Sequence, residues 1–118
     1  MSERLADTLL NSGMADPAID RLPQPAIEYT VVIPVMNRPR ELSRVLESIV
    51  KATEAEGCPR IIVVDDASAS PATTRRIASA HGAEFLGLST NLGPAGARNA
   101  GLALVTTELV VFLDSDLV

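Results

Sequence analysis

Four short runs of strand-forming residues alternate with three helical patterns along residues 29–118, and this alternation restricts the fold more than any other feature. The strand-like runs are TVVI at 30–33, RIIVVDD at 60–66, AEFLGL at 83–88 and ELVVFL at 108–113. Pro34 is expected to end the first strand, because proline cannot donate a hydrogen bond to a ladder. Strands joined by crossover helices form parallel sheets with right-handed βαβ units. The sequence therefore predicts an α/β fold with a Rossmann-like βαβαβαβ parallel sheet.

The segments between these runs predict the helices. The first begins at Pro39, whose fixed φ suits a first helical position, and ends before Gly57 and Pro59. Its apolar residues recur at helical spacing and form one stripe, which comprises Leu42, Val45, Leu46, Ile49 and Val50. The other two helices are expected in PATTRRIASAHG at 71–82 and GPAGARNAGLALVT at 93–106.

The composition fits one small domain whose core consists mainly of Val, Ile, Leu and Ala. The chain has 118 residues, of which 47% are hydrophobic and only 3% aromatic, a balance that suits a parallel sheet covered by helices. Residues 1–28 contain three prolines and lie outside the alternating pattern. We interpret them as an N-terminal extension or linker, or alternatively as a strap packed on the domain.

Charge and apolar run length argue against several classes of protein. The net charge is −5, and no stretch concentrates basic residues among aromatic ones, which argues against nucleic-acid binding. The single cysteine, Cys58, permits no internal disulfide and forms no metal-ligand pattern. The run LVVFL at 109–113 is far too short to span a bilayer, and the first residues lack a secretory signal pattern. We therefore expect a cytoplasmic location without a membrane span in this chain, or alternatively a position of the full-length protein at the inner face of the membrane.

Polar residues gather after every predicted strand. The clusters are Pro34, Asn37 and Arg38; Asp65, Asp66 and Ser68; Asn91, Gly93 and Gly96; and Asp114 and Asp116. The carboxyl ends of parallel strands meet at one edge of a sheet, and ligands bind there near the point where strand order reverses. The sequence therefore predicts a ligand site at this edge.

Two aspartates close the last strand. Asp114 and Asp116 stand two residues apart in extended chain, so they can point to the same side about 7 Å apart. Two oxygen ligands on one side suit a hard divalent cation that also takes oxygens from a diphosphate. The competing interpretation is an ordinary solvated strand end.

The acidic pair after the second strand has two interpretations. Asp65 and Asp66 alternate faces, so only one can turn toward a ligand, and the pair could instead form a turn capped by Ser68. The glycines and Arg98 of NLGPAGARNAG stand where the chain enters a helix, whose free N–H groups favour phosphate. The alternative there is close helix-to-sheet packing by Ala95, Ala97 and Ala100. His81, beside Gly82, is expected to cap a helix.

Four motifs in this order resemble the donor-binding half of family-2 glycosyltransferases. They are VVIPVMNRP, IIVVDDAS, NLGPAGARNAGL and VVFLDSD, and the likeness covers residues 29–118. Within the family, HGA, NLGPAGARNAGLA and FLDSDLV are most similar to the glycosyltransferases of the mycofactocin system. The resemblance implies the nucleotide-binding half of a GT-A fold.

The resemblance also implies a nucleotide-diphosphate sugar donor, usually a UDP-sugar, with Mg²⁺ or Mn²⁺. The implied donor-binding residues are Pro34, Val35, Asn37, Asp65, Asp66, Arg98 and Asp114, and the implied metal ligands are Asp114 and Asp116. The segment from Pro34 to Asn37 would line the base and ribose pocket, and Asp66 or Asp65 would contact the base. Inverting transfer is usual in this family: a carboxylate base activates the acceptor hydroxyl while the metal neutralises the leaving diphosphate.

Family members continue beyond the D-x-D motif into an acceptor-binding half that holds the general base, whereas this sequence ends at Val118. No catalytic residue is identified here, because the general base is expected beyond Val118. Residues 29–118 are therefore interpreted as a truncated nucleotide-sugar-binding half-domain that is inactive alone. The free edge of its last strand would invite pairing with another chain, so a self-associating, non-catalytic homo-oligomer is an alternative.

A phospho-acceptor receiver domain is the alternative from another class. It would explain an acidic pair after one strand and an aspartate, Asp114, after a later one. Receivers begin near their acidic pair, however, and need a lysine on a later strand, whereas Lys51 is the only lysine here. The receiver interpretation also leaves NLGPAGARNAG unexplained.

Overall fold

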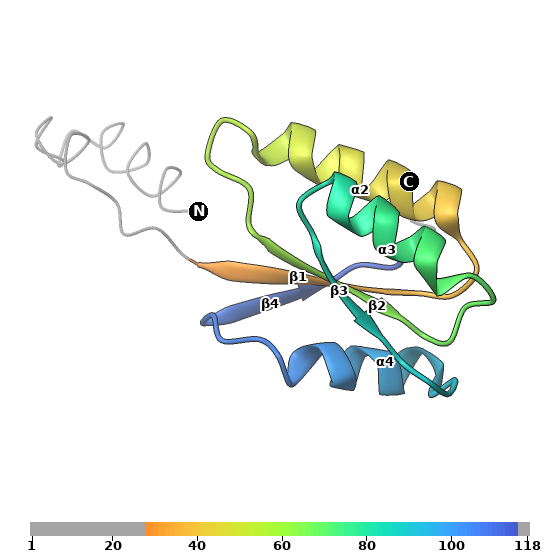
Figure 1. Ribbon diagram of the computed structural model, residues 1–118. Coiled ribbons are helices and arrows are strands. Elements are labelled where there is room, and N and C mark those ends of the chain that lie inside the picture. Colours follow the sequence, from red (N-terminus) through yellow and green to blue (C-terminus); the bar gives the residue numbers. More distant parts are fainter. Residues whose placement is uncertain (1–27, 116–118) are drawn as a thin grey trace, which may run out of the picture.

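A computed structural model describes residues 28–115, which form a four-stranded parallel sheet with helices on both faces (Figure 1). The elements are β1 (Tyr29–Val35), α2 (Pro39–Thr53), β2 (Arg60–Asp65), α3 (Pro71–Ala80), β3 (Glu84–Gly87), α4 (Gly93–Leu102) and β4 (Leu109–Phe112). The predicted βαβαβαβ order is confirmed. The predictions for residues 1–27 and for Asp116 fall outside the described residues.

The strands lie in the order β3-β2-β1-β4, and every neighbouring pair is parallel. The chain first adds β2 and β3 on one side of β1 and then returns to place β4 on the other side. The order therefore reverses between β1 and β4. In open α/β sheets this reversal opens a crevice at the carboxyl ends of the strands.

The core consists of two layers, one on each face of the sheet. Helices α2 and α3 cover one face and α4 covers the other (Figure 1). Alternate residues of the central strands point to opposite layers: Val31 and Ile33 pack under α2 and α3, whereas Val32 packs under α4. Burial on both faces explains why β1 and β2 read as continuous apolar runs. Within the described residues, no helix is both long and apolar enough to cross a membrane.

Pro34 does not end β1, so that prediction is wrong. The carbonyl of Val32 accepts a hydrogen bond from Leu113 N–H at 3.1 Å, so Val32 turns its backbone groups toward β4. Pro34 faces the same side two residues later, where the ladder with β4 has already ended at Phe112. Its missing N–H therefore breaks no ladder, and β1 continues alongside β2 as far as Val35.

Small residues let α4 approach the sheet closely, as the packing interpretation of this segment predicts. Ala97 is fully buried, whereas Ala95 is exposed. A Cβ on Gly101 would lie 2.5 Å from a methyl carbon of Val32 and 2.9 Å from one of Val64. The helix ends at Leu102, earlier than predicted, because the next residues form a tight turn with bonds between residues three apart.

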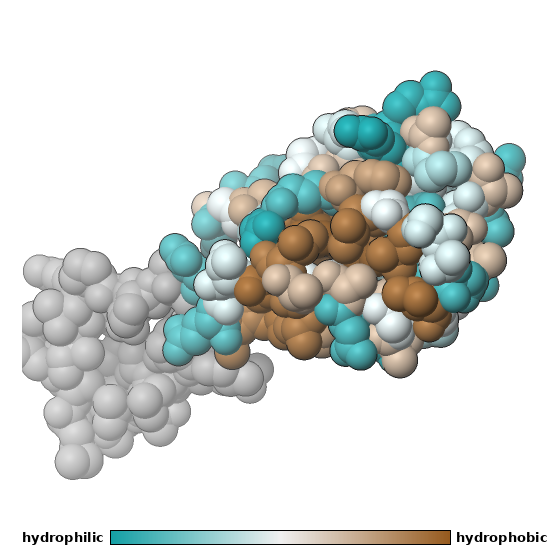
Figure 2. All heavy atoms as spheres, turned by 60° about the horizontal axis from the view of Figure 1, so that its bottom comes forward, coloured by the Kyte–Doolittle hydropathy of each residue, from teal (hydrophilic) through white to brown (hydrophobic). Residues whose placement is uncertain are grey.

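One edge of the sheet exposes apolar residues. Figure 2 shows a continuous apolar area on the side of the molecule where α4 and β4 lie. The large exposed apolar residues of these two elements and of the turn between them are Leu102, Leu104, Leu109, Val111 and Phe112. β4 pairs with β1 on one side, and its other side is an edge of the four-stranded sheet.

Candidate functional site

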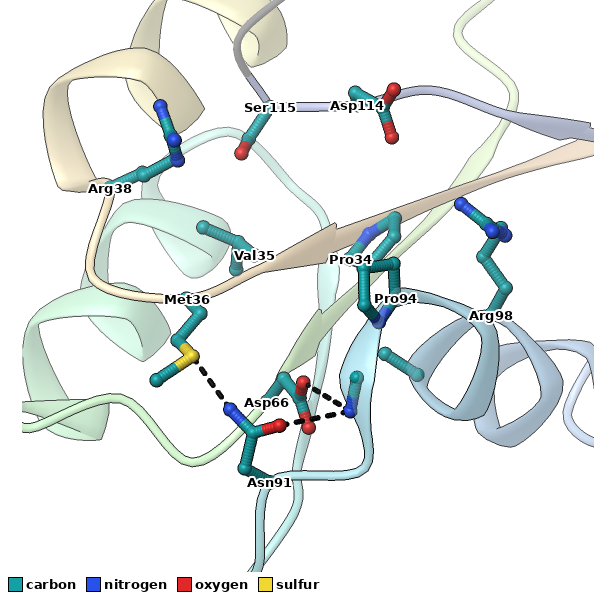
Figure 3. Close-up of a pocket in the computed structure, with 12 residues that line it drawn as sticks. Pro34, Val35, Met36, Arg38, Asp66, Asn91, Pro94, Arg98, Asp114 and Ser115 are labelled. Carbon is teal, nitrogen blue, oxygen red and sulfur yellow. Dashed lines mark hydrogen bonds between the residues drawn. The ribbon is translucent and has the colours of Figure 1, made fainter.

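A cavity of about 400 Å³ opens at the carboxyl ends of the strands, beside the reversal between β1 and β4. Its lining residues come from all four strand ends and from α4: Pro34, Val35, Met36, Arg38, Asp66, Asn91, Gly93, Pro94, Ala97, Arg98, Asp114 and Ser115. Figure 3 shows Asp66 and Asn91 at one end of this pocket and Asp114 and Ser115 at the other, with Pro34 between them. The ligand edge predicted from the sequence is therefore a hollow.

The structure brings most of the predicted donor-binding residues to this pocket. Those that line it are Pro34, Val35, Asp66, Arg98 and Asp114. Asn37 and Asp65 do not line it, and Asp116 lies outside the described residues. The two residues left out have structural partners instead.

Asp66 joins β2 to the start of α4. Its carboxylate accepts hydrogen bonds from the N–H groups of Leu92 at 2.7 Å and Gly93 at 3.0 Å, and the residue is only 5% exposed. A carboxylate at this position satisfies two free amides and complements the helix dipole. The sequence suggested that the amides at this helix entry favour phosphate, but these two already bind Asp66.

Asp65 is buried beneath the edge of the sheet. Its Oδ2 accepts the N–H of Ser68 at 3.0 Å, and its Oδ1 has no hydrogen-bond partner among the described residues. The turn interpretation of the acidic pair, with Ser68 as its partner, is confirmed for Asp65. The two neighbouring carboxylates do alternate, because only Asp66 reaches the pocket.

Asn37 links the first two loops of this edge. Its backbone N–H donates to Ser68 Oγ at 2.9 Å, and its Oδ1 accepts the N–H of Ala69 at 2.8 Å. Its φ of 55° lies in the left-handed region, which asparagine tolerates better than most residues. These contacts explain why Asn37 belongs to the edge without lining the pocket.

Two guanidinium groups give the pocket its positive charge. Arg38 follows β1, and Arg98 projects from α4 toward β1 (Figure 3). Arg98 lies in the second turn of α4, one turn beyond the helix entry at which the sequence placed it. The ion pair found among residues 28–115, Arg60–Glu84, lies at the opposite edge of the sheet. Neither pocket arginine is therefore neutralised by a described carboxylate.

The donor set fits a divalent cation that shares a diphosphate. Asp114 is exposed at the pocket rim, whereas both carboxylate oxygens of Asp66 are engaged. Among the described residues, no three His, Cys, Asp or Glu side chains gather as a metal-binding group. Mg²⁺ bound with substrate phosphates takes only one or two protein carboxylates. An exposed carboxylate such as that of Asp114 is the kind of ligand that this arrangement requires.

Met36 lines the pocket within the segment Pro34 to Asn37, as the family resemblance implied, whereas Pro94 and Ser115 were not singled out from the sequence. Pro94 and Ser115 carry no charge and form no recognisable ligand motif, and Ser115 is buried within the D-x-D segment. Asn91 belonged to a predicted edge cluster, but its role could not be assigned; its Nδ2 contacts Met36 Sδ at 2.8 Å. From the sequence, these residues could have been assigned to the pocket only because they lie close to charged residues in the chain.

The prediction that His81 caps a helix is confirmed. His81 caps α3, with its N–H bound to Ala78 O and its Nδ1 2.8 Å from Ile77 O. Cys58 is exposed in the loop before β2. Lys51 lies in the last turn of α2, and not on a strand as a receiver domain would require.

Comparison with known proteins gives one family. Residues 30–118 match the model of glycosyl transferase family 2. The chain is 42% identical over 117 residues to a pre-mycofactocin glycosyltransferase of Mycobacterium tuberculosis, covering 98% of this chain and 23% of that protein. It is 36% identical over 106 residues to the succinoglycan biosynthesis protein ExoO of Rhizobium meliloti, covering 87% of this chain and 28% of that protein. The chain thus spans about a quarter of the length of these relatives.

A solved structure agrees with the sequence comparison. Glucosyl-3-phosphoglycerate synthase from Mycobacterium tuberculosis, crystallised with Mn²⁺, UDP and glucosyl-3-phosphoglycerate, matches with a TM-score of 0.64 and 28% identity. The match covers 79% of this chain and 35% of the synthase. The parallel sheet is accordingly the nucleotide-binding part of a GT-A fold, and the receiver interpretation is excluded. On the family match over residues 30–118 and the pocket that its motifs surround, the chain belongs to glycosyltransferase family 2.

Proposed function

We propose that residues 29–118 form the donor-binding part of a glycosyltransferase that uses a nucleotide-diphosphate sugar, most simply a UDP-sugar, with Mg²⁺ or Mn²⁺. The observation that carries this proposal is the pocket itself. It places two arginines and the carboxylate of Asp114 around one hollow at the reversal of strand order. A structure of a 28% identical family relative contains UDP and Mn²⁺, which supports the same ligands here.

The pocket offers separate regions for the parts of such a donor. Pro34, Val35 and Met36 supply an apolar wall next to polar Asn91 and Asp66, which suits a flat base with polar edges. Arg98 and Arg38 supply positive charge for the diphosphate, and a guanidinium can bind two phosphate oxygens at once. Asp114 stands at the far end, within the part of the pocket where ribose or a metal would lie.

Asp114 and Asp116 would hold the divalent cation between the protein and the diphosphate. The bound ion would neutralise negative charge as the diphosphate leaves. The chain's own residues would orient the donor and keep its base and phosphates in fixed positions. The proposal assigns donor binding to residues 29–118. It does not assign these residues the transfer of the sugar to an acceptor.

Calorimetric titration of the 118-residue protein with UDP tests the proposal, with and without Mn²⁺. We expect metal-dependent binding, about tenfold or more weakened by Asp114→Asn or Arg98→Ala, because each change removes a charge-assisted contact. Asp116→Asn should remove the Mn²⁺ dependence.

Matched controls lie away from the pocket. Glu108→Gln and Arg44→Ala change exposed residues of the same charges and should leave UDP affinity unchanged. A folded wild-type protein that does not bind UDP would contradict the proposal, and so would equal losses in the control and pocket variants.

A further inference from the structure

Three of the four loops at the carboxyl edge of the sheet are tied to one another in a closed ring. The loop after β1 bonds to the loop after β2 through Asn37, and the loop after β2 bonds to the start of α4 through Asp66. The ring closes where Asn91, before α4, contacts Met36, after β1. Each loop thus contacts both of the others by side chains.

The first link is the most elaborate of the three. Asn37 both donates through its N–H and accepts through its Oδ1, and its partners are the adjacent residues Ser68 and Ala69. Ser68 is also fixed by its own backbone, because its N–H donates to the buried Asp65 carboxylate. A backbone bond from Asp66 N–H to Val35 O, at 2.8 Å, lies beside these contacts. Six residues at the ends of β1 and β2 and in the loops that follow are therefore fixed together.

Backbone strain shows that this conformation needs support. Asn37 has a φ of 55° and Ala67 a φ of 60°, and these are the two residues other than glycine with positive φ in residues 28–115. Alanine gains nothing from the left-handed region and adopts it only when the surrounding contacts impose it. Ala67 lies between Asp66 and Ser68, so the strained residue lies between two links of the ring.

The loop after β4 is attached differently. Within residues 28–115, the backbone N–H of Leu113 donates to Val32 O, and the Leu113 side chain packs against the core. Asp114 is exposed at the rim. Side-chain hydrogen bonds connect the three other walls of the pocket to one another.

We propose that Asn37 is a positioning residue for the nucleotide. It holds the loop 66–70 so that Asp66 and the segment Pro34–Met36 keep their places in the pocket before a nucleotide arrives. This inference rests on the proposed function, and it differs from the role that the family resemblance implied, in which Asn37 lines the nucleotide pocket itself. Fixing a binding surface in advance lowers the entropy cost of binding, so loosening it weakens affinity without removing a ligand contact.

Asn37→Gly is the sharpest test, because glycine keeps the backbone N–H and accepts a positive φ but removes the Oδ1 acceptor. In UDP titrations with Mn²⁺ we expect about tenfold weaker binding, the effect of losing one hydrogen bond that fixes a loop. Asn37→Asp, which keeps an acceptor oxygen and tolerates this φ, should restore affinity to within about threefold. Ser68→Ala removes the other partner and should weaken binding in the same direction.

Amide spectra and hydrogen exchange without nucleotide separate positioning from a local structural role. In Asn37→Gly we expect faster exchange at Ala69 and, through Asp66, shifted amide resonances at Leu92 and Gly93. Asn99→Ala, at an exposed asparagine of α4 outside the pocket, should change neither affinity nor these amides.

The outcomes are distinct. Faster exchange at Ala69 with unchanged Leu92 and Gly93 amides would overturn the inference. The loss of the Asn37 side chain would then affect only the loop after β2 and would not reach Asp66. Unchanged UDP affinity in Asn37→Gly would also overturn it. If the wild-type protein binds no UDP, the proposed function falls, and the amide measurements still decide whether Asn37 positions Asp66.

Discussion

Strands β2 and β4 have nearly the same kind of sequence, RIIVVD and LVVF, but opposite surroundings. β2 pairs with β1 on one side and β3 on the other, and its residues from Ile61 to Asp65 are buried. In the part of the chain that the structure describes, β4 pairs with β1 alone, and Leu109, Val111 and Phe112 are exposed. A continuous apolar run therefore describes a buried strand in one place and an exposed edge in the other.

The difference shows what an apolar run does and does not specify. Such a run favours a strand wherever it occurs, but burial depends on how many neighbours the sheet places around it. Sheet edges usually carry charged residues or proline that discourage pairing. β4 carries neither, and together with Leu102 and Leu104 it forms the apolar area seen in Figure 2. We propose that this edge pairs with a second copy of the chain.

The largest expected effect compares one substitution in the two strands. Val63→Ala in β2 should lower the free energy of unfolding by roughly 2 kcal/mol or more, because a fully buried side chain leaves a cavity. Val111→Ala in β4, at a residue that is 39% exposed, should cost less than about 0.5 kcal/mol. Chemical denaturation of both variants measures the difference. Equal costs would mean that β4 is as well covered in solution as β2.

The next effect concerns self-association through β4. Light scattering over a concentration series should show the average mass rising above 12.4 kDa, and Phe112→Glu should weaken this association about tenfold or more by placing a charge in the apolar edge. Leu92→Glu is the control, because Leu92 is also an exposed apolar residue but lies at the opposite end of α4. A chain that stays monomeric at every concentration would refute pairing at this edge.

The smallest effect concerns β3, the other edge strand, which is tied by charge. Arg60 of β2 donates to Glu84 of β3, with one contact at 2.9 Å, and also to Leu104 O. The hydrogen bond from Arg60 holds the pKa of Glu84 below its usual 4.5. A carboxyl with a lowered folded-state pKa stabilises the fold above its unfolded pKa, and this contribution is lost as the pH falls through the folded value.

Glu84→Gln should therefore lower the thermal midpoint slightly at pH 7 and have no effect at a pH well below 4. Both groups are exposed, so the shift should be small. Midpoints measured from pH 7 down to pH 3 check the sign. A gap between wild type and variant that widens in acid would show that Glu84 acts by another route.

The fold could be predicted from the sequence because its signals are local. Pro39 and Pro71 begin α2 and α3 as expected, and the apolar stripe of α2 faces the sheet through Leu42, Val45 and Leu46. The error at Pro34 has a different origin. Whether a proline interrupts a strand depends on which neighbour its missing N–H would face, and that neighbour, β4, lies more than 70 residues further along the chain.

The site was predictable in part for the same reason. Topology alone places strand ends at one edge, so Pro34, Asp66, Arg98 and Asp114 could be expected to meet there, and they do. Sequence could not decide between Asp65 and Asp66, since the choice depends on which face of β2 each occupies. The four motifs found in the sequence lie within the matched family region. The motifs did not show which of their residues face the ligand and which hold a loop in place.

The sequence by itself determined the order of strands and helices, the edge where a ligand would bind and the chain's family, because periodicity, proline positions and motifs are properties of neighbouring residues. Only the tertiary structure decided that Asp66 caps α4, that Asn37 holds a neighbouring loop instead of lining the pocket, and that β4 is an edge strand of the sheet within residues 28–115. Each of these depends on which distant segments lie side by side, and that is settled by packing rather than by local preference.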